Sequence, residues 1–513
     1  MTYLNDNKKH SIKRNTITNY LGQGYTIGAA IIFTPFYLQF LGAEAYGLVG
    51  FYMVMQNWFS LLDMGLSATL GRQVAYARSQ ANGFDEKFLT LLKTFELIFI
   101  VLTLSIIISI YCSSNWVAHN WIKPIGLNPA DISYCISVMG LIIGLRLFST
   151  IYRSGINGFE DQVWINKVSI IINTIKYIGS LLILIFISKD VTHFFEYQLV
   201  IGMIEVALIG KRFYYNLPPI GGAINLFKFD WRVLKKILPF TLSITYTSTI
   251  LIVITQLDKL LLSGVLSLEE FGYFSLTVMI AGALISLSIP VFLAFLPRLT
   301  LLAAGPNSKE LIATYVNMTQ IITWVTISSA MVISNFSQEI LYALTGDWKA
   351  HIWGGKILIW YALGSCVYVL GTFQYYLQNA FGKLRLYVIG STIALAVQTP
   401  LIYFVTNNYG ALGSGQLWFA FSVVWFLGWT AVVHNNLLPG FHTNWLKRDL
   451  LPMAISIIGA SFVVEKVVQI DMNASRTMIT IQTAIVAISF LTITSLSVRT
   501  FREKIIEMLR KKL

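Results

Sequence analysis

Five charged side chains lie in the interiors of the third to sixth long apolar stretches of this 513-residue chain: Lys93, Glu96, Arg146, Lys176 and Glu205. A charge at the centre of a membrane-spanning helix costs about 2.5–3.5 kcal/mol, so it needs a partner or a polar cavity. Arg146 and Lys176 could bind an anion. Arginine suits phosphate because its planar guanidinium donates two parallel hydrogen bonds and stays charged. The carboxylates could serve as counter-ions or proton carriers.

Each of these residues also has a structural interpretation. Lys93 and Glu96 are three residues apart near one end of a helix, so they could pair with each other or extend to the membrane surface. Lys176 is too central to reach the surface easily, so it either faces a cavity or is a buried partner of Glu205 or Glu96. For Arg146 we favour the functional interpretation. Glu205 stays open between a counter-ion and a protonatable coupling residue.

The elements that must position these charges are membrane-spanning helices. Hydrophobic residues make up 56% of the chain and charged residues 12%, which is too little charge to cover a soluble protein of this size. Fourteen stretches have about the length that crosses a bilayer. They are residues 17–40, 46–66, 89–112, 131–152, 164–187, 192–210, 237–262, 271–296, 311–334, 354–377, 385–406, 412–433, 451–468 and 477–498.

The connections between these stretches alternate in charge. Of the 37 lysines and arginines, 27 lie toward one side, 7 lie toward the other, and 3 lie deep in the interior of the stretches. Cytoplasmic loops retain Lys and Arg, so the basic side is the cytoplasm and holds both termini. The net charge of +13 therefore faces anionic membrane lipid, and we expect no nucleic-acid partner. The chain is expected to be an all-α, multi-pass membrane protein.

Charges near the ends of the stretches are candidate gates: Asp63, Arg72, Asp258, Lys259 and Arg298. Asp63 lies at the cytoplasmic end of the second stretch, where a gate or a structural cap is expected. Asp258 and Lys259 are adjacent near the outer end of the seventh stretch. They could form an ion-pair gate between two halves of the protein, or simply lie in solvent.

The two halves are related in sequence. Residues 43–51 read AEAYGLVGF and residues 268–276 read LEEFGYFSL, and both segments are expected on the outer side. Four pairs match at offsets of 225 or 226 residues: Glu44 with Glu269, Tyr46 with Phe271, Gly47 with Gly272, and Arg72 with Arg298. Six stretches per half with the same starting side indicate a parallel repeat.

This repeat predicts four parts of the chain. Residues 1–212 form an N-terminal bundle of six helices, and residues 213–236 form an amphipathic cytoplasmic linker. Residues 237–434 form a second six-helix bundle, and residues 435–513 hold two further helices and a basic tail. No HExxH, GxxxxGK[ST] or acidic metal-binding cluster is present, so we expect a transporter without a metal or organic cofactor.

The chain resembles bacterial polysaccharide flippases of the O-antigen type, in the multidrug/oligosaccharidyl-lipid/polysaccharide exporter superfamily. The resemblance runs over essentially the whole chain. Its segments are NYLGQGYTIGAAIIFTPFYLQFLGAEAYGLVGFY, SLLDMGLSATLGRQVA, TQLDKLLLSGVLSLEEFGYFSL and FQYYLQNAFGKLRL, of which the third is the most specific. The resemblance implies two six-helix bundles in a V around a central cavity. The related lipid II flippase adds two C-terminal helices, similar to the last two stretches here.

The resemblance also implies the function. The substrate class is an oligosaccharide on undecaprenyl pyrophosphate, moved by alternating access from the cytoplasmic to the periplasmic leaflet of the bacterial inner membrane. Other polysaccharide-assembly membrane proteins are expected partners. Arg146 and Lys176 would hold the pyrophosphate, and proton or sodium antiport could use Glu96 or Glu205.

Two alternatives remain at this stage. A multidrug or cation antiporter of the same superfamily would need acidic groups in its cavity, whereas the most central charges here are basic. A membrane polymerase or ligase of the same pathway should show a large outer loop with catalytic Arg or His. The longest outer connections, at 113–130 and 335–353, lack that arginine pattern.

Overall fold

A computed structural model describes residues 18, 22, 24–26, 28–80, 84–217, 231–306, 308–498 and 502. These residues are helical or lie in short connections, and the single β-bridge among them joins Lys123 to Ser267. The predicted all-α membrane fold is confirmed. The basic N-terminus, residues 218–230 of the predicted linker and nearly all of the basic tail lie outside the described part of the chain.

Helices occupy the positions of all fourteen predicted stretches. Within the described residues, 12 helices are long and apolar enough to cross a membrane. One of them, α14 (Arg385–Leu437), contains two predicted stretches separated by a kink at Gly410, where φ is +59°. The second stretch corresponds to α2 (Ala43–Phe59), whose 17 residues fall just below that length.

The described residues form two compact units, residues 1–272 and 273–513. The predicted division at residues 212, 236 and 434 stays a prediction. After the N-terminal helix Gly24–Leu41 and α2, the first unit holds α3 (Leu66–Ser79), α4 (Glu86–Trp116), α5 (Pro129–Gly158), α6 (Gln162–Phe186), α7 (Val191–Asn216) and α8 (Trp231–Val265). The second unit holds most of α9 (Leu268–Ala303), α10 (Ser308–Asn335), α11 (Ser337–Thr345), α12 (Gly355–Gly371), α13 (Phe373–Ala380), α14, α15 (Phe441–Asn444), α16 (Leu451–Val467) and α17 (Arg476–Thr494).

A backbone break follows α2. The short 3₁₀ helix Ser60–Asp63 ends at Met64 and Gly65, which have φ values of +48° and +66°. This left-handed conformation stops helical hydrogen bonding. The Asp63 carboxylate then accepts hydrogen bonds from the Ser67 backbone N–H (3.3 Å) and hydroxyl (2.7 Å) at the start of α3. The structure thus places Asp63 as a cap, while its role as a gate stays a prediction.

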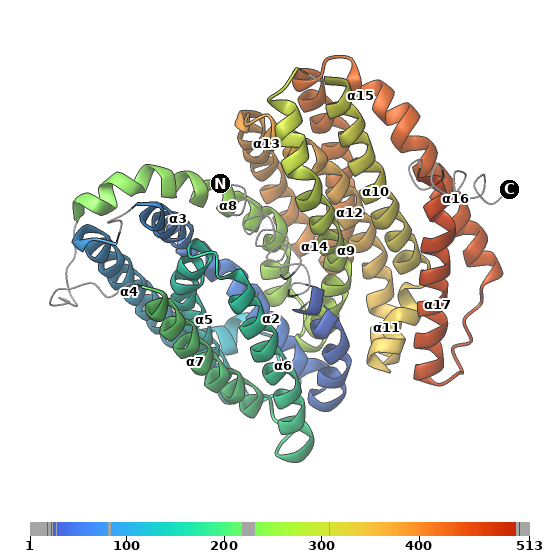
Figure 1. Cartoon of the computed structure of the whole chain (residues 1–513). Helices are drawn as coiled ribbons and strands as arrows, with labels where there is room; N and C mark the ends of the chain where they lie inside the picture. The colour runs from blue at the N-terminus through green and yellow to red at the C-terminus, as the bar shows by residue number, and fades with distance from the viewer. Residues whose placement is uncertain are drawn as a thin grey trace. The chain divides into compact units, whose positions relative to one another are not determined.

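Helix α5 is the central helix of the first unit and packs against α3, α4 and α7 (Figure 1). Gly140 and Gly144 are four residues apart, so they lie on one face. A Cβ on Gly140 would lie 2.9 Å from the Ile110 side chain, and one on Gly144 would lie 3.0 Å from Ile107. Small residues at this spacing let membrane helices approach closely, which fixes α5 against α4.

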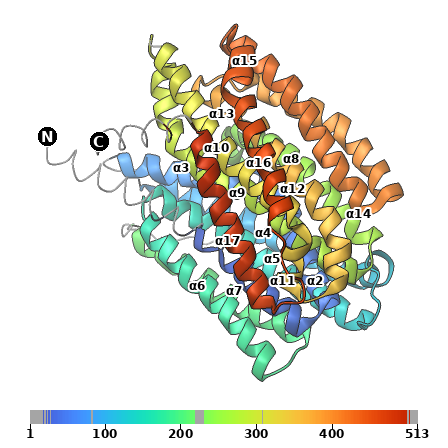
Figure 2. The same cartoon turned by 90° about the vertical axis from the view of Figure 1, so that its right-hand side faces the viewer.

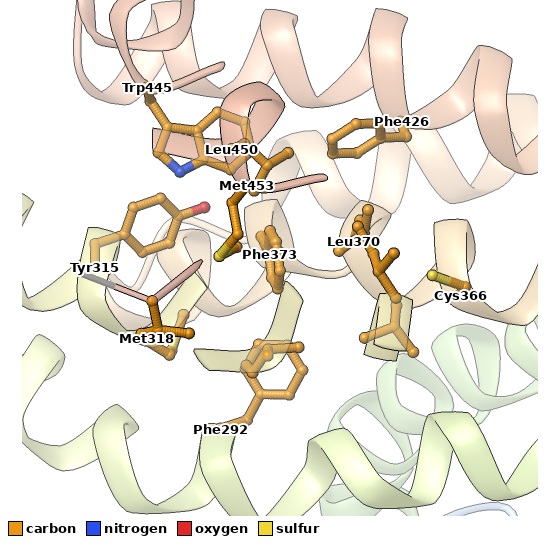
Figure 3. Close-up of a cluster of buried hydrophobic side chains, with 14 of the residues drawn as sticks. Phe292, Tyr315, Met318, Cys366, Leu370, Phe373, Phe426, Trp445, Leu450 and Met453 are labelled. Atoms are coloured by element: carbon orange, nitrogen blue, oxygen red, sulfur yellow. The ribbon is translucent and has the colours of Figure 1, made fainter. Parts of the chain in front are cut away.

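The second unit has an apolar core, and its last helices, α16 and α17, contribute residues to this core. Phe292, Tyr315, Phe373 and Trp445 are buried together there (Figure 3). Figure 2 shows α16 and α17 beside α10, in agreement with their packing. Polar contacts secure this position: the Trp445 indole donates to the Thr319 hydroxyl (3.1 Å), and Trp324 donates to the Leu491 carbonyl (3.2 Å).

The repeat-related glycines lie against each other's helices. A Cβ on Gly47 of α2 would overlap the carbonyl oxygen of Leu268, and a Cβ on Gly272 of α9 would overlap that of Ala43. Both residues belong to the first unit as defined above. The close approach of the two helix starts explains why the repeat keeps glycine at both positions.

We predict that Gly272→Ala destabilises the protein by about 1–3 kcal/mol, because the added methyl group meets backbone atoms that cannot move aside cheaply. The matched control is Gly282→Ala on the same helix, where nothing lies within 4 Å of the added Cβ. Thermal unfolding of the purified protein in detergent measures both changes. Equal melting temperatures for the two variants would contradict the close contact.

Candidate functional site

The first unit contains a cavity of about 580 Å³. The N-terminal helix, α2, α5, α6 and α7 line it. Its ionisable lining includes three cations and one carboxylate: Arg146, Arg153, Lys176 and Glu205. The two candidate cations, Arg146 and Lys176, therefore share one cavity, as does the candidate counter-ion Glu205.

Helical periodicity brings these side chains to the cavity. Arg146 and Arg153 are seven residues apart on α5, which is close to two turns and puts both on the same face. On α6, polar residues recur every three or four residues, which is about one helical turn, and they form a stripe along the cavity. They are Asn166, Ser169, Asn173 and Lys176.

Glu205 joins two of the cations. Its Oε2 accepts a hydrogen bond from Lys176 Nζ at 2.7 Å, and its Oε1 is paired with Arg153. Arg153 also donates from Nη1 to the Ser169 hydroxyl at 3.1 Å. The carboxylate of α7 thus connects α5 and α6, with one oxygen for each cation. The predicted pairing of Lys176 is with Glu205 and not with Glu96.

Arg146 has a different kind of partner. With its amide oxygen turned toward α5, Gln56 of α2 accepts hydrogen bonds from Arg146 Nε (2.7 Å) and Nη1. Among the described residues, no carboxylate forms an ion pair with Arg146. Because Glu205 is one carboxylate against three cations, the charged lining has a formal charge of +2.

Neutral polar and aromatic groups make up much of the remaining wall. Tyr52 and Tyr177 are partly exposed there, and Gln198 and Asn173 present amides. Tyr37 is buried and donates to the Tyr177 carbonyl at 2.9 Å. The cavity can therefore offer cations to an anionic group and hydrogen bonds to hydroxyl groups.

Lys93 and Glu96 lie outside this cavity lining and form a separate buried network. Lys93 Nζ is 2.8 Å from Glu96 Oε2 and 3.0 Å from the Tyr214 hydroxyl. Glu96 Oε1 accepts hydrogen bonds from Tyr152 (3.0 Å) and Tyr214. The pairing predicted from their spacing is present, and the network ties α4 to α5 and α7.

The candidate gates lie apart from the cavity lining. Asp258 Oδ1 is 3.1 Å from Lys259 Nζ, so these neighbours pair with each other. Arg298 pairs with Glu310 at an exposed position between α9 and α10. Arg72 is exposed on α3. Gating by these residues stays a prediction.

Arg153 was missed by the sequence analysis. The predicted fourth stretch ended at residue 152, so Arg153 counted as part of a cytoplasmic connection, whereas α5 continues to Gly158. The available signal was its spacing of seven residues from Arg146, with Ser149 and Thr150 between them on the same part of the helix. The number of cations in the cavity is therefore three and not two.

Residues 12–302 match the sequence model of a family described as polysaccharide biosynthesis protein. A protein of Shigella flexneri described as "Putative O-antigen transporter" is 19% identical over 414 residues, covering 80% of this chain and 94% of that protein.

Solved structures share the fold. The lipid II flippase MurJ in an inward closed conformation is 16% identical with a TM-score of 0.65, covering 96% of this chain and 99% of that one. An inward-facing multidrug resistance transporter of the MATE family, in the MOP superfamily, is 15% identical with a TM-score of 0.63, covering 80% of this chain and 95% of that one.

We predict that Lys93→Met lowers stability by about 3–5 kcal/mol, because it leaves the Glu96 carboxylate buried without its cation. The double variant Lys93→Met/Glu96→Gln should recover much of this loss, since it removes both charges. The control is Arg78→Met, which breaks an ion pair whose side chains are 48% and 64% exposed and should cost at most about 1 kcal/mol. Thermal unfolding checks the series, and a double variant less stable than Lys93→Met would disprove the pairing argument.

Proposed function

The chain belongs to the polysaccharide biosynthesis protein family, and on this premise we propose that it flips a lipid-linked oligosaccharide with an anionic diphosphate across a membrane. The observation that carries the proposal is the cavity with three cations and one carboxylate, inside a bundle of membrane helices. A net positive lining of this kind suits a substrate whose charged part is an anion.

The physical problem in flipping such a lipid is desolvation of its charged group. An isolated ion moved from water into a medium of low dielectric constant loses tens of kcal/mol of solvation in the simplest treatment. Cations held in place by the protein replace part of the lost hydration, and they interact more strongly there than in bulk water. Arg146, Arg153 and Lys176 supply this compensation in the proposed mechanism.

The three cations have distinct roles in this proposal. Arg146 is held by a neutral amide, so its full charge is available to the first phosphate, and its guanidinium can donate two hydrogen bonds. Lys176 and Arg153 bind the second phosphate. The amides and hydroxyls of the wall, such as Asn173 and Gln198, hydrogen-bond to sugar hydroxyls close to the diphosphate.

We propose that the carrier is undecaprenyl and that transport runs outward, with support from the resemblance to O-antigen flippases and from the basic connections expected in the cytoplasm. We propose that the protein lies in the bacterial inner membrane with both termini in the cytoplasm, and that it receives its substrate from other polysaccharide-assembly proteins. Alternating access between the two leaflets would move the diphosphate past the hydrocarbon core.

Cation antiport is less well supported. A cationic drug entering the cavity would meet three positive charges, and the carboxylate there already pairs with two of them. The MATE-like fold is shared by both transporter classes and does not favour either. A polymerase or ligase is not supported, because the similar proteins named above are transporters or flippases.

We predict that Arg146→Gln combined with Lys176→Gln abolishes surface polysaccharide and leaves lipid-linked single units on the inner leaflet, because the diphosphate loses two of its cations. The measurement is polysaccharide export in cells lacking the native gene, together with the level of the variant protein in the membrane. The control is Arg78→Gln, which removes an exposed cation outside the cavity and should leave export unchanged. Normal export by the double variant would remove both residues from the site.

A further inference from the structure

We propose that Glu205 is a resident counter-anion that occupies the place of one substrate phosphate, leaves its cations when the substrate binds and expels the substrate when it returns. This inference rests on the proposed transport of a diphosphate. It assigns Glu205 to a counter-ion role, the first of the two interpretations that its sequence position allowed.

The Glu205 carboxylate bridges two cations of different helices. One oxygen of Glu205 binds Lys176 of α6 at 2.7 Å, and the other pairs with Arg153 of α5. A phosphate group bridges two cations in the same manner, through separate oxygens. The carboxylate therefore occupies the position that the second phosphate needs, and both cannot bind these cations at once.

The charged groups around Glu205 are cations. Across the cavity, α2 contributes Tyr52, α5 contributes Arg146 and Arg153, and α6 contributes Lys176 and Tyr177. The remaining lining residues, including those that α7 adds beside Glu205, are uncharged. Within the described lining, Glu205 is thus the single group that can neutralise Arg153 and Lys176 when no substrate is present.

The transporter without substrate also needs an anion for these cations. After release, the cavity must return to the cytoplasmic side with cations that have lost their phosphate. Two unpaired cations in a desolvated cavity would be costly, and they would retain the product strongly. An internal carboxylate lowers both costs, because the cations exchange one anion for another and are paired in both parts of the cycle.

The exchange predicts opposite effects on affinity and turnover. Glu205→Gln removes the competing anion, so the protein should bind farnesyl diphosphate, used as a soluble probe, about tenfold more tightly or more. Release of the substrate and return of the empty cavity to the cytoplasmic side should both become slower. The flipping rate of a fluorescent farnesyl diphosphate in proteoliposomes should therefore fall, although the affinity rises. A purely structural role would weaken binding and lower stability together.

The experiment compares the full-length wild type, Glu205→Gln and Glu205→Asp by titration with farnesyl diphosphate, flipping rate and melting temperature. The aspartate of Glu205→Asp keeps the negative charge, but its shorter side chain reaches the two cations poorly. The affinity and the flipping rate of this variant should therefore lie between those of the wild type and those of Glu205→Gln. If Glu205→Gln does not fold, Glu205→Asp takes its place in the comparison. The matched control is Asp161→Asn. Asp161 Oδ2 lies 2.6 Å from Nη2 of Arg212, which is on the same helix as Glu205, and neither Asp161 nor Arg212 lines the cavity. This variant should leave the affinity for farnesyl diphosphate unchanged.

The outcomes separate the two proposals. Tighter binding with slower flipping supports the exchange. Unchanged or weaker binding by a folded Glu205→Gln variant overturns the exchange and leaves the proposed function in place. Failure of the folded wild type to bind the probe at all overturns the diphosphate function, and the exchange mechanism with it.

Discussion

Compensation of charge inside a low-dielectric bundle is the constraint on which the first unit depends. Two of its groups of charges, around Glu96 and around Glu205, show how this compensation is made. Lys93 and Glu96 neutralise each other, and Glu96 also accepts hydrogen bonds from two tyrosine hydroxyls. Around the cavity, one carboxylate pairs with two cations, whereas the third cation, Arg146, forms no ion pair with a carboxylate among the described residues. The first arrangement is complete, whereas the second keeps a net positive charge that an anionic ligand can satisfy.

The scaffold explains why these charges can stay close together. Helix α5 supplies two of the three cavity cations, and its position is held by glycine contacts with α4 and by the network of Glu96. Helix α5 therefore contacts both the Lys93–Glu96 network and the cavity. Because α6 and α7 bring Lys176 and Glu205 to that helix, a single three-helix neighbourhood holds the whole charged site.

Apolar length made the helices predictable, since a membrane-spanning stretch has a length set by the bilayer. Within the part of the chain that the structure describes, helices occupy the positions of all fourteen stretches. The break at Met64 and Gly65 was not predicted, because a left-handed residue other than glycine leaves little trace in composition. Arg153 was placed in a connection for a related reason: α5 extends past its apolar part, and the end of apolarity is not the end of a helix.

The sequence alone indicated five of the charges that lie within the helices, Lys93, Glu96, Arg146, Lys176 and Glu205, because these follow from position within an apolar stretch. The basic connections also predict an orientation in the membrane, which stays a prediction. Only the tertiary structure decided the partners: Lys176 pairs with Glu205 and not with Glu96, and Arg146 is bound by Gln56. Those choices depend on which helices become neighbours and on how far each side chain reaches between them. The residue pattern of a single helix predicts neither its neighbours nor the reach of side chains between helices.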